Sequence, residues 1–264
     1  MLKYVSVKRF KTRPKNLAYL AYRLISPAID PLVMINGIKN YPRFIKELLK
    51  YSDLKDAEKI EFKNIYPILS DSLSSTPFDN HYFYQDIWAA KKIFRSKIKV
   101  HCDVGSNIEF VGFLSTFTRV EFVDIRPLKV RLKNFNSIKG TVLNLPYESG
   151  SVRSLSCLHV AEHIGLGRYG DKLDPNGTMK ACKELERVLA KNGNLYFSLP
   201  IGKPRLCFNA HRIYSPKQIL GYFDKLTLAE FSVVDDNAKF IEKTNLKLFE
   251  KSNYACGLFW FTKK

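Results

Sequence analysis

Gly105 and Asp124 have the residue types and the spacing expected of a site that binds a nucleoside. Gly105 lies in the turn Asp103-Val-Gly-Ser-Asn107, and Asp124 ends the next apolar run 19 residues later. Glycine lets the backbone turn tightly and approach a ligand, because it carries no Cβ. An acid about 20 residues beyond such a turn can accept hydrogen bonds from ribose hydroxyl groups. The pair therefore predicts contact with an adenosine-like group.

The turn itself narrows the choice of cofactor. It lacks two of the three glycines of the dinucleotide fingerprint G-x-G-x-x-G, so it does not suit a pyrophosphate. A nucleoside without a phosphate fits better, and we predict S-adenosylmethionine. Asp103 is expected either to receive the amino group of the methionine part or to cap the helix that follows. A plain strand-to-helix turn without a ligand is the alternative.

Length and net charge limit the number of domains and the kinds of partner to expect. The chain has 264 residues, enough for one large domain or for a domain with an extension. Its 43 Lys and Arg against 25 Asp and Glu give a net charge of +18. That surplus favours anionic partners such as phosphorylated small molecules, nucleic acid or a membrane surface, although a solvated lysine-rich surface explains it equally well. The basic residues are spread along the chain, which weakens the case for nucleic acid.

Cysteine usage and hydropathy indicate a compartment. The five cysteines form no C-x-x-C pair, and in a chain of this length such scattered cysteines indicate free thiols in a reducing environment. No apolar run reaches the length needed to span a membrane, and the N-terminus has no uninterrupted apolar leader. We therefore expect a soluble cytoplasmic protein without a membrane span. The oligomeric state cannot be read from the sequence.

The pattern of elements divides the chain in two. Residues 1–95 read as a helical extension, with amphipathic helices at 17–25, 44–49 and 80–95. From residue 96 to 264, strand and helix signals alternate, which favours an α/β fold with a mostly parallel sheet. The expected strands are 98–103, 120–124, 139–143, 153–158, 194–199, 227–234 and 256–262, and the expected helices are 107–116, 127–136, 174–191 and 215–224.

Two features of this domain stand apart from a simple parallel sheet. Polar residues alternate with apolar ones along the first strand, where His101 and Asp103 interrupt the run. A central parallel strand is usually apolar on both faces, so this strand fits poorly. No helix signal separates the last two strands, so one of them is expected to be an antiparallel partner at the edge.

Further motifs follow in order along the chain. Asn144-Leu145-Pro146 comes after the third expected strand, and the fourth ends in His159-Val-Ala-Glu162-His163. From residue 98 to the C-terminus, the chain resembles the class I S-adenosylmethionine-dependent methyltransferases. The resemblance implies a Rossmann-like fold with a seven-stranded sheet and helices on both faces. It also implies a set of cofactor contacts: Asp103, Gly105, Ser106, Asp124, Ile125, Asn144, Leu145 and His159.

Two positions depart from the pattern of that class. Asn144 replaces the acid common at its place, and Asn107 stands where a second glycine often lies. An amide can still contact adenine. His159 is as well explained by packing and hydrogen bonding as by contact with the cofactor.

Two loops narrow the resemblance. The stretches Gly165–Pro175 and Phe208–Tyr214, together with Cys157-Leu-His159, look like the methyltransferase-like domain of unknown function 268. Bacterial members of that family are often associated with surface-polysaccharide modification. The resemblance implies a transferase of capsule or lipopolysaccharide biosynthesis, although kinship of fold does not establish a substrate.

His159-Val-Ala-Glu162-His163 also matches the H-x-x-E-H pattern of inverted zinc peptidases. That chemistry needs both histidines on one face of a sustained helix and a third ligand farther along the chain. Here the motif ends an apolar strand, and three glycines follow at positions 165, 167 and 170. We therefore predict no resident metal.

Methyl transfer to a hydroxyl group gains from a base that removes the proton of the acceptor. Histidine suits this task, and we expect His163 or His211 to be the base, with Asp171 orienting it. Guanidinium groups bind phosphate or carboxylate through paired hydrogen bonds, so Arg168 and Arg212 are expected to hold an anionic acceptor. The full set expected to bind the acceptor is Tyr82, Tyr84, Gln85, Arg168, Tyr169, Asn209 and Arg212. Ordinary surface polarity is the alternative for both loops.

The sequence thus predicts an O-methyltransferase that acts on a small phosphorylated or nucleotide-linked precursor of a surface glycan. Residues 1–95 are expected to cover the cofactor. One rival is an RNA methyltransferase, which the charge favours but no RNA-binding motif supports. The other is a non-catalytic binding protein that retains the fold.

Overall fold

The structure, a computed structural model, describes residues 25–26 and 30–264. It divides into two units, Met1–Asp79 and Asn80–Lys264. The first unit contains helix α2 (Pro31–Ser52) and the short 3-10 helix η1 (Phe62–Asn64). The helix expected at 44–49 is the second half of α2, whereas the pattern at residues 17–24 lies outside the described residues. None of the helices in the described ranges is long and apolar enough to cross a membrane.

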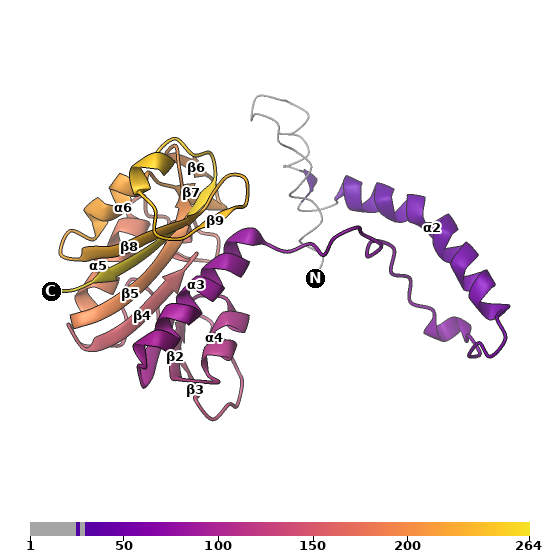
Figure 1. Cartoon of the computed structure of the whole chain (residues 1–264), viewed down its shortest axis with the longest axis horizontal. Coiled ribbons are helices and arrows are strands. Elements are labelled where there is room, and N and C mark those ends of the chain that lie inside the picture. The colour runs from indigo at the N-terminus through magenta and orange to yellow at the C-terminus, as the bar shows by residue number, and fades with distance from the viewer. Residues whose placement is uncertain (1–24, 27–29) are drawn as a thin grey trace. The chain divides into compact units, whose positions relative to one another are not determined.

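The second unit is built on one large sheet, shown in Figure 1. Its eight strands lie in the order β3-β2-β1-β4-β5-β10-β8-β9. The first five of these run parallel to one another, β10 is antiparallel to both of its neighbours, and β9 is antiparallel to β8. The strands are β1 (Val100–Val104), β2 (Arg119–Asp124), β3 (Phe135–Lys139), β4 (Val152–Leu158), β5 (Leu189–Ile201), β8 (Thr227–Val234), β9 (Phe240–Ile241) and β10 (Ala255–Thr262).

Helices cover both faces of the sheet, as the Rossmann-like prediction requires (Figure 1). Helices α5 (Gly177–Val188) and α6 (Pro216–Tyr222) pack on one face, and their buried residues share a core with β4, β5 and β10. Helices α3 (Asn80–Ser96) and α4 (Ile108–Leu114) pack on the other face, against residues of β2, β4, β5, β8 and β10. A short hairpin of β6 (Arg205–Cys207) and β7 (His211–Ile213) stands apart from the sheet.

The α/β prediction is confirmed, but the sheet has eight strands rather than seven. The additional strand is β9, whose two residues are too few to give a periodic signal. The antiparallel strand is β10, and it lies inside the sheet between β5 and β8 rather than at an edge. Its apolar sequence fits that interior position, since all but two of its residues are buried.

The third strand and the helix before it were predicted wrongly. Residues 127–136 form no helix, and the strand is β3 rather than 139–143. The side chains of Val130 and Leu132 are exposed, so the stretch has no apolar stripe to bury against the sheet. The chain turns at Gly140, where an added Cβ would lie 2.6 Å from Cγ1 of Val123.

Helix α5 is shorter at both ends than the predicted 174–191. Asp174 lies before the helix, where its carboxylate accepts a hydrogen bond from the backbone N–H of Asn176. At the other end the chain passes directly from Val188 into β5. Asn192, with φ of 60°, therefore marks an irregularity within β5 and not the end of a helix.

The polar residues of β1 are accommodated inside the sheet. His101 is fully buried, and its Nδ1 and Nε2 lie 2.8 Å from the hydroxyl oxygens of Ser154 and Ser156 on β4. Burial lowers the pKa of His101 to about 3, so the ring is neutral and one nitrogen donates while the other accepts. The serines on the next strand thus satisfy the hydrogen-bonding groups of a buried polar residue in a central strand.

Helix α3 belongs to the unit that contains the sheet, whereas the sequence analysis assigned residues 80–95 to the extension. Trp88, Ala89 and Ile93 are buried in one core with residues of α4 and β2. A cover formed by the N-terminal residues over the cofactor stays a prediction.

Ser154→Ala should destabilise the fold by about 1–3 kcal/mol, because it leaves Nδ1 of His101 buried without a partner. Urea unfolding measures the change. Ser151→Ala is the matched control, since the hydroxyl of Ser151 is exposed and bonds only to the carbonyl of Glu148. Equal stability of the two variants would show that the buried pairing contributes nothing.

Candidate functional site

A pocket lies at the carboxyl ends of β1, β2 and β4, the edge where ligands bind in open α/β sheets. Its volume is about 100 Å³. Of the predicted cofactor-binding and catalytic residues, Gly105, Asp124, Ile125, His159 and His163 line it, and so does Tyr169. The remaining lining residues are Val104, Val123, Arg126, Gly140, Thr141, Val142, Val160 and Ile164.

Gly105 and Asp124 face each other across the floor of this pocket. Gly105 has φ of +68°, a conformation that favours glycine. A Cβ added there would lie 3.3 Å from Cγ1 of Val160 and 3.7 Å from Oδ2 of Asp124. Val160 and the carboxylate thus already crowd the place of a Cβ, and glycine keeps the backbone directly beside the carboxylate. The other carboxylate oxygen, Oδ1, accepts a hydrogen bond of 2.6 Å from the backbone of Arg126.

Asp103 and Ser106 do not line the pocket but stabilise the glycine turn through hydrogen bonds. The carboxylate of Asp103 accepts hydrogen bonds from the backbone N–H and hydroxyl of Ser106 and from the hydroxyl of Ser156. The hydroxyl oxygen of Ser106 also accepts a bond of 3.0 Å from the N–H of Leu158. Burial raises the pKa of Asp103 to about 6, although these hydrogen bonds oppose the shift. Asp103 does not cap α4, because the N-cap is Asn107, whose side chain accepts a hydrogen bond from the N–H of Glu109. Contact of Asp103 with the methionine part of a cofactor stays a prediction.

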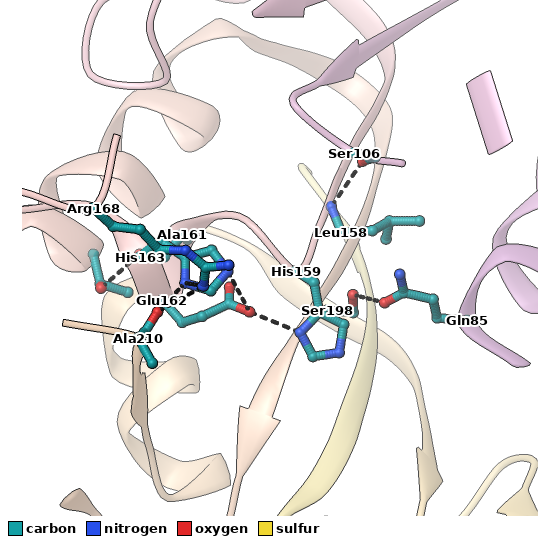
Figure 2. A network of polar contacts seen from close by, with 11 residues as sticks. Gln85, Ser106, Leu158, His159, Ala161, Glu162, His163, Arg168, Ser198 and Ala210 are labelled. Atoms are coloured by element: carbon teal, nitrogen blue, oxygen red, sulfur yellow. Dashed lines mark hydrogen bonds and ion pairs between the residues drawn. The ribbon is translucent and has the colours of Figure 1, made fainter. Parts of the chain in front are cut away.

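Glu162 is a buried carboxylate between two histidines, as Figure 2 shows. Its Oε1 lies 2.7 Å from Nδ1 of His159 and 3.6 Å from Nε2 of His163. Burial opposes ionisation of Glu162, but the two histidines outweigh it and lower its pKa. The carboxylate can therefore orient one ring while it stabilises positive charge on the other.

His163 is fixed in one tautomer by the loop that carries Ala210. A carbonyl oxygen can only accept, so Nδ1 of His163 donates to the carbonyl of Ala210 at 2.6 Å. Arg168 donates to the same oxygen at 2.9 Å (Figure 2). Burial lowers the pKa of His163 below its ordinary value, so Nε2 carries a lone pair at neutral pH. His163 thus has the chemistry of a base at the pocket wall.

His211 lies near this group but does not line the pocket. Its ring centroid is 6.4 Å from that of His163 and 5.2 Å from that of Tyr254. Burial lowers the pKa of His211 to about 4. Of the two predicted bases, only His163 borders the space where a ligand would lie.

Asp171 and Arg212 hold together the loop of residues 165–174, called the glycine loop below. These contacts differ from the roles expected for the two side chains. Asp171 accepts backbone hydrogen bonds from Gly165 and Tyr169, at 2.6 and 3.2 Å, and contacts neither predicted base. The guanidinium of Arg212 donates to the carbonyls of Ile164 and Asp174, at 2.6 and 3.0 Å. Both side chains tie the two ends of the loop together, so Arg212 is already engaged by the protein itself.

Tyr169 closes the pocket from the glycine loop. Its ring lies 5.1 Å from the guanidinium carbons of both Arg126 and Arg168. Cation–π contacts at such exposed sites are weak, on the order of 0.5–1 kcal/mol. These side chains can therefore move aside at little cost.

The remaining predicted residues do not line the pocket, and of these Tyr82 lies against a lining residue. Tyr82 is 5.3 Å from His159 between ring centroids, whereas Tyr84 stacks on Phe240. Gln85 is buried and accepts a hydrogen bond from Ser198 (Figure 2). Asn144, Leu145 and Asn209 are outside the lining: Asn144 and Asn209 are exposed, and Leu145 belongs to the core.

Several residues in or near the pocket were not expected from the sequence. Thr141 and Val142 take the place expected of Asn144, because they directly follow the turn at Gly140. Asp86 of α3 is a half-buried acid that accepts a hydrogen bond of 3.4 Å from Asn107. Burial raises its pKa to about 7. The helical pattern of residues 80–95 gave no sign that this acid would meet the glycine turn.

The H-x-x-E-H motif lacks the helix that a zinc peptidase needs. Residues Ala161–His163 form a single 3-10 turn, and His159 precedes it with φ of 54°. The two histidines of the motif therefore do not lie one turn apart on a continuous helix face.

Comparisons with known proteins are informative about the fold. The family described as "Caenorhabditis protein of unknown function, DUF268" matches residues 147–255. No curated protein matches the chain. The family match covers the glycine loop and both predicted bases.

Two solved structures share the architecture. The N-methyltransferase NodS from Bradyrhizobium japonicum WM9, in complex with S-adenosyl-L-homocysteine, has a TM-score of 0.50 and 12% identity, covering 83% of this chain and 97% of that chain. The [4+2]-cyclase SpnF has a TM-score of 0.50 and 9% identity, covering 67% and 81%. The chain has the fold of the class I methyltransferases.

Arg212→Ala should loosen the glycine loop, because the carbonyls of Ile164 and Asp174 lose their shared donor. Hydrogen exchange of the backbone N–H groups of residues 165–174 should accelerate at least tenfold, which corresponds to about 1.4 kcal/mol. Arg205→Ala, at an exposed position on β6, is the control. Unchanged exchange in Arg212→Ala would show that the loop does not depend on this residue.

Proposed function

We propose that the chain is an S-adenosylmethionine-dependent methyltransferase. The observation that supports this most directly is the geometry of the pocket floor, where the carboxylate of Asp124 stands beside the bare Cα of Gly105. A ribose bound there would give both hydroxyl groups to one carboxylate, with no side chain of residue 105 in its way.

Other lining residues suit the rest of such a ligand. Ile125 and Val142 offer apolar contacts to an adenine ring, and Thr141 offers polar ones. Asp86 lies outside the pocket lining, beside Asn107, and we propose it rather than Asp103 for the amino group, because its Oδ1 has no hydrogen bond within the described part of the chain. Every oxygen of the Asp103 carboxylate is already engaged.

The pocket must open for a nucleoside to enter. Its volume of about 100 Å³ is below the roughly 300 Å³ typical of small-molecule sites. Arg126, with an exposed side chain, and Tyr169, which is 40% exposed, are the groups that narrow it. Their rotation toward solvent is the opening step in this proposal.

When bound, S-adenosylmethionine supplies a methyl group on a positively charged sulfur. For a hydroxyl acceptor, a base must take the proton as the new carbon–oxygen bond forms and the carbon–sulfur bond breaks. Nε2 of His163 accepts that proton in our proposal, and the carboxylate of Glu162, 3.6 Å away, stabilises the resulting imidazolium. The carbonyl of Ala210 holds the ring in place through Nδ1.

The acceptor we propose is a small phosphorylated or nucleotide-linked sugar, a precursor of a surface glycan, methylated in the cytoplasm. Arg126 and Arg168 flank Tyr169 at the mouth of the pocket and would contact the phosphate.

The net charge of +18 supports an anionic acceptor of either kind, sugar phosphate or RNA. RNA binding that weakens steeply with salt would favour the second candidate, an RNA methyltransferase. A folded chain that binds neither S-adenosylmethionine nor S-adenosylhomocysteine would favour the third, a non-catalytic binding protein.

Asp124→Asn should weaken binding of S-adenosylhomocysteine by about 10- to 100-fold, because a hydrogen bond to a charged group contributes about 1.5–3 kcal/mol. Isothermal titration calorimetry measures the dissociation constant. Asp224→Asn is the matched control, since Asp224 bonds Lys183 on the surface. Equal affinities in the two variants would contradict the proposed ribose contact.

His163→Ala should lower turnover by about 100- to 10,000-fold, the usual contribution of a general base. His211→Ala should cost less, because His211 does not border the pocket. The rates are measured as release of S-adenosylhomocysteine. The acceptor for this assay is first identified by screening sugar nucleotides. Because burial lowers the pKa of His163, the ring is unprotonated at neutral pH, so the rate should be flat there and fall in acid. A larger loss in His211→Ala would reverse the assignment.

A further inference from the structure

Three metal-binding side chains from distant parts of the chain meet beside the pocket. They are His81 at the start of α3, His159 at the end of β4 and Cys256 at the start of β10. One potential ligand atom from each lies within 4.8 Å of the other two. His159 and Cys256 are buried, and His81 is partly exposed, so the group is enclosed on most sides and open on one.

The ring of His159 is oriented as a metal ligand would be. Its Nδ1 lies 2.7 Å from Oε1 of the buried carboxylate of Glu162 (Figure 2), so Nε2 is the ring nitrogen left for a ligand. Nε2 is buried, and it has no hydrogen-bond partner among the described residues. Carboxylate–histidine pairs of this kind fix the tautomer and raise the basicity of ligating histidines in zinc sites.

We propose that His81, His159 and Cys256 bind a zinc ion. Two imidazole nitrogens and one thiolate form a donor set that suits zinc, and three protein ligands leave one tetrahedral position for water or a ligand. Zinc ligands about 2.0–2.3 Å from the ion lie roughly 3.5 Å from one another. Donors that are at most 4.8 Å apart need only small side-chain rotations to reach that geometry.

Charge and protons balance at the proposed site. Cys256 must give up its thiol proton to solvent when the metal binds, whereas both histidines bind as neutral rings. Zinc with one thiolate carries a charge of +1, and the carboxylate of Glu162 behind His159 compensates it. The simpler alternative is a contact between the Cys256 thiol and the imidazoles without metal, and the experiment must separate the two.

This site differs from the one that the H-x-x-E-H motif suggests. His163 is not a ligand here, and Glu162 acts only through His159. His81 and Cys256 lie 78 residues before and 97 residues after His159, so no local motif could indicate them. His159 also lines the pocket, so the metal would lie next to the proposed cofactor site.

Metal content of the purified full chain tests the proposal. After saturation with zinc and dialysis, mass spectrometry of the metal should give one zinc per chain for the wild type. Cys256→Ser and His81→Ala should each reduce zinc to the background level of a variant that carries both substitutions. His81 is partly exposed, so His81→Ala is the variant best able to fold, and circular dichroism checks this. Cys207→Ser is the control, because that cysteine lies on β6 outside the cluster.

Two further measurements make the result decisive. Cobalt-loaded wild type should show a sulfur-to-cobalt charge-transfer band that Cys256→Ser lacks and Cys207→Ser keeps. Glu162→Gln should weaken zinc binding by about 10- to 100-fold, as loss of an outer-shell partner does. A folded wild type without stoichiometric zinc would overturn the proposal. Equal zinc in wild type, His81→Ala and Cys256→Ser would overturn it too. The readouts do not depend on methyl transfer, so the proposed function can fail independently.

Discussion

The fully buried carboxylate of Asp103 is the constraint on which the site depends. It accepts hydrogen bonds from Ser106, just beyond the glycine turn, and from Ser156 on the neighbouring strand. The turn is thereby joined to β4, and the hydroxyl of Ser106 extends the connection to the backbone of Leu158. Because the carboxylate is occupied in this way, Asp124 rather than Asp103 is the acid that lines the pocket beside Gly105.

A second buried carboxylate, that of Glu162, organises the opposite wall. One of its oxygens faces both His159 and His163, so a single acid orients two rings with different tasks. In the methyl-transfer proposal Nε2 of His163 accepts a proton, and in the zinc proposal His159 binds the metal together with His81 and Cys256. The methyl-transfer proposal and the zinc proposal therefore share one electrostatic centre but make separate demands on it.

The sequence was sufficient for elements whose signals are local. The glycine turn, the acid that ends β2 and a mostly parallel sheet were all predicted, since each rests on residue type and spacing. Pairings across the fold were not: the serines that satisfy His101 lie on another strand, and Cys256 reaches His159 only through the order of the sheet. Arg212 was assigned to the substrate because a guanidinium in a loop looks the same whether it binds a ligand or two backbone carbonyls.

A crystal structure of the chain with S-adenosylhomocysteine tests the central claim most directly. The account predicts the ribose hydroxyl groups within hydrogen-bond distance of the Asp124 carboxylate, over Gly105, with Tyr169 and Arg126 turned outward. A nucleoside bound elsewhere, or a pocket still closed by Tyr169 at saturating ligand, would contradict it.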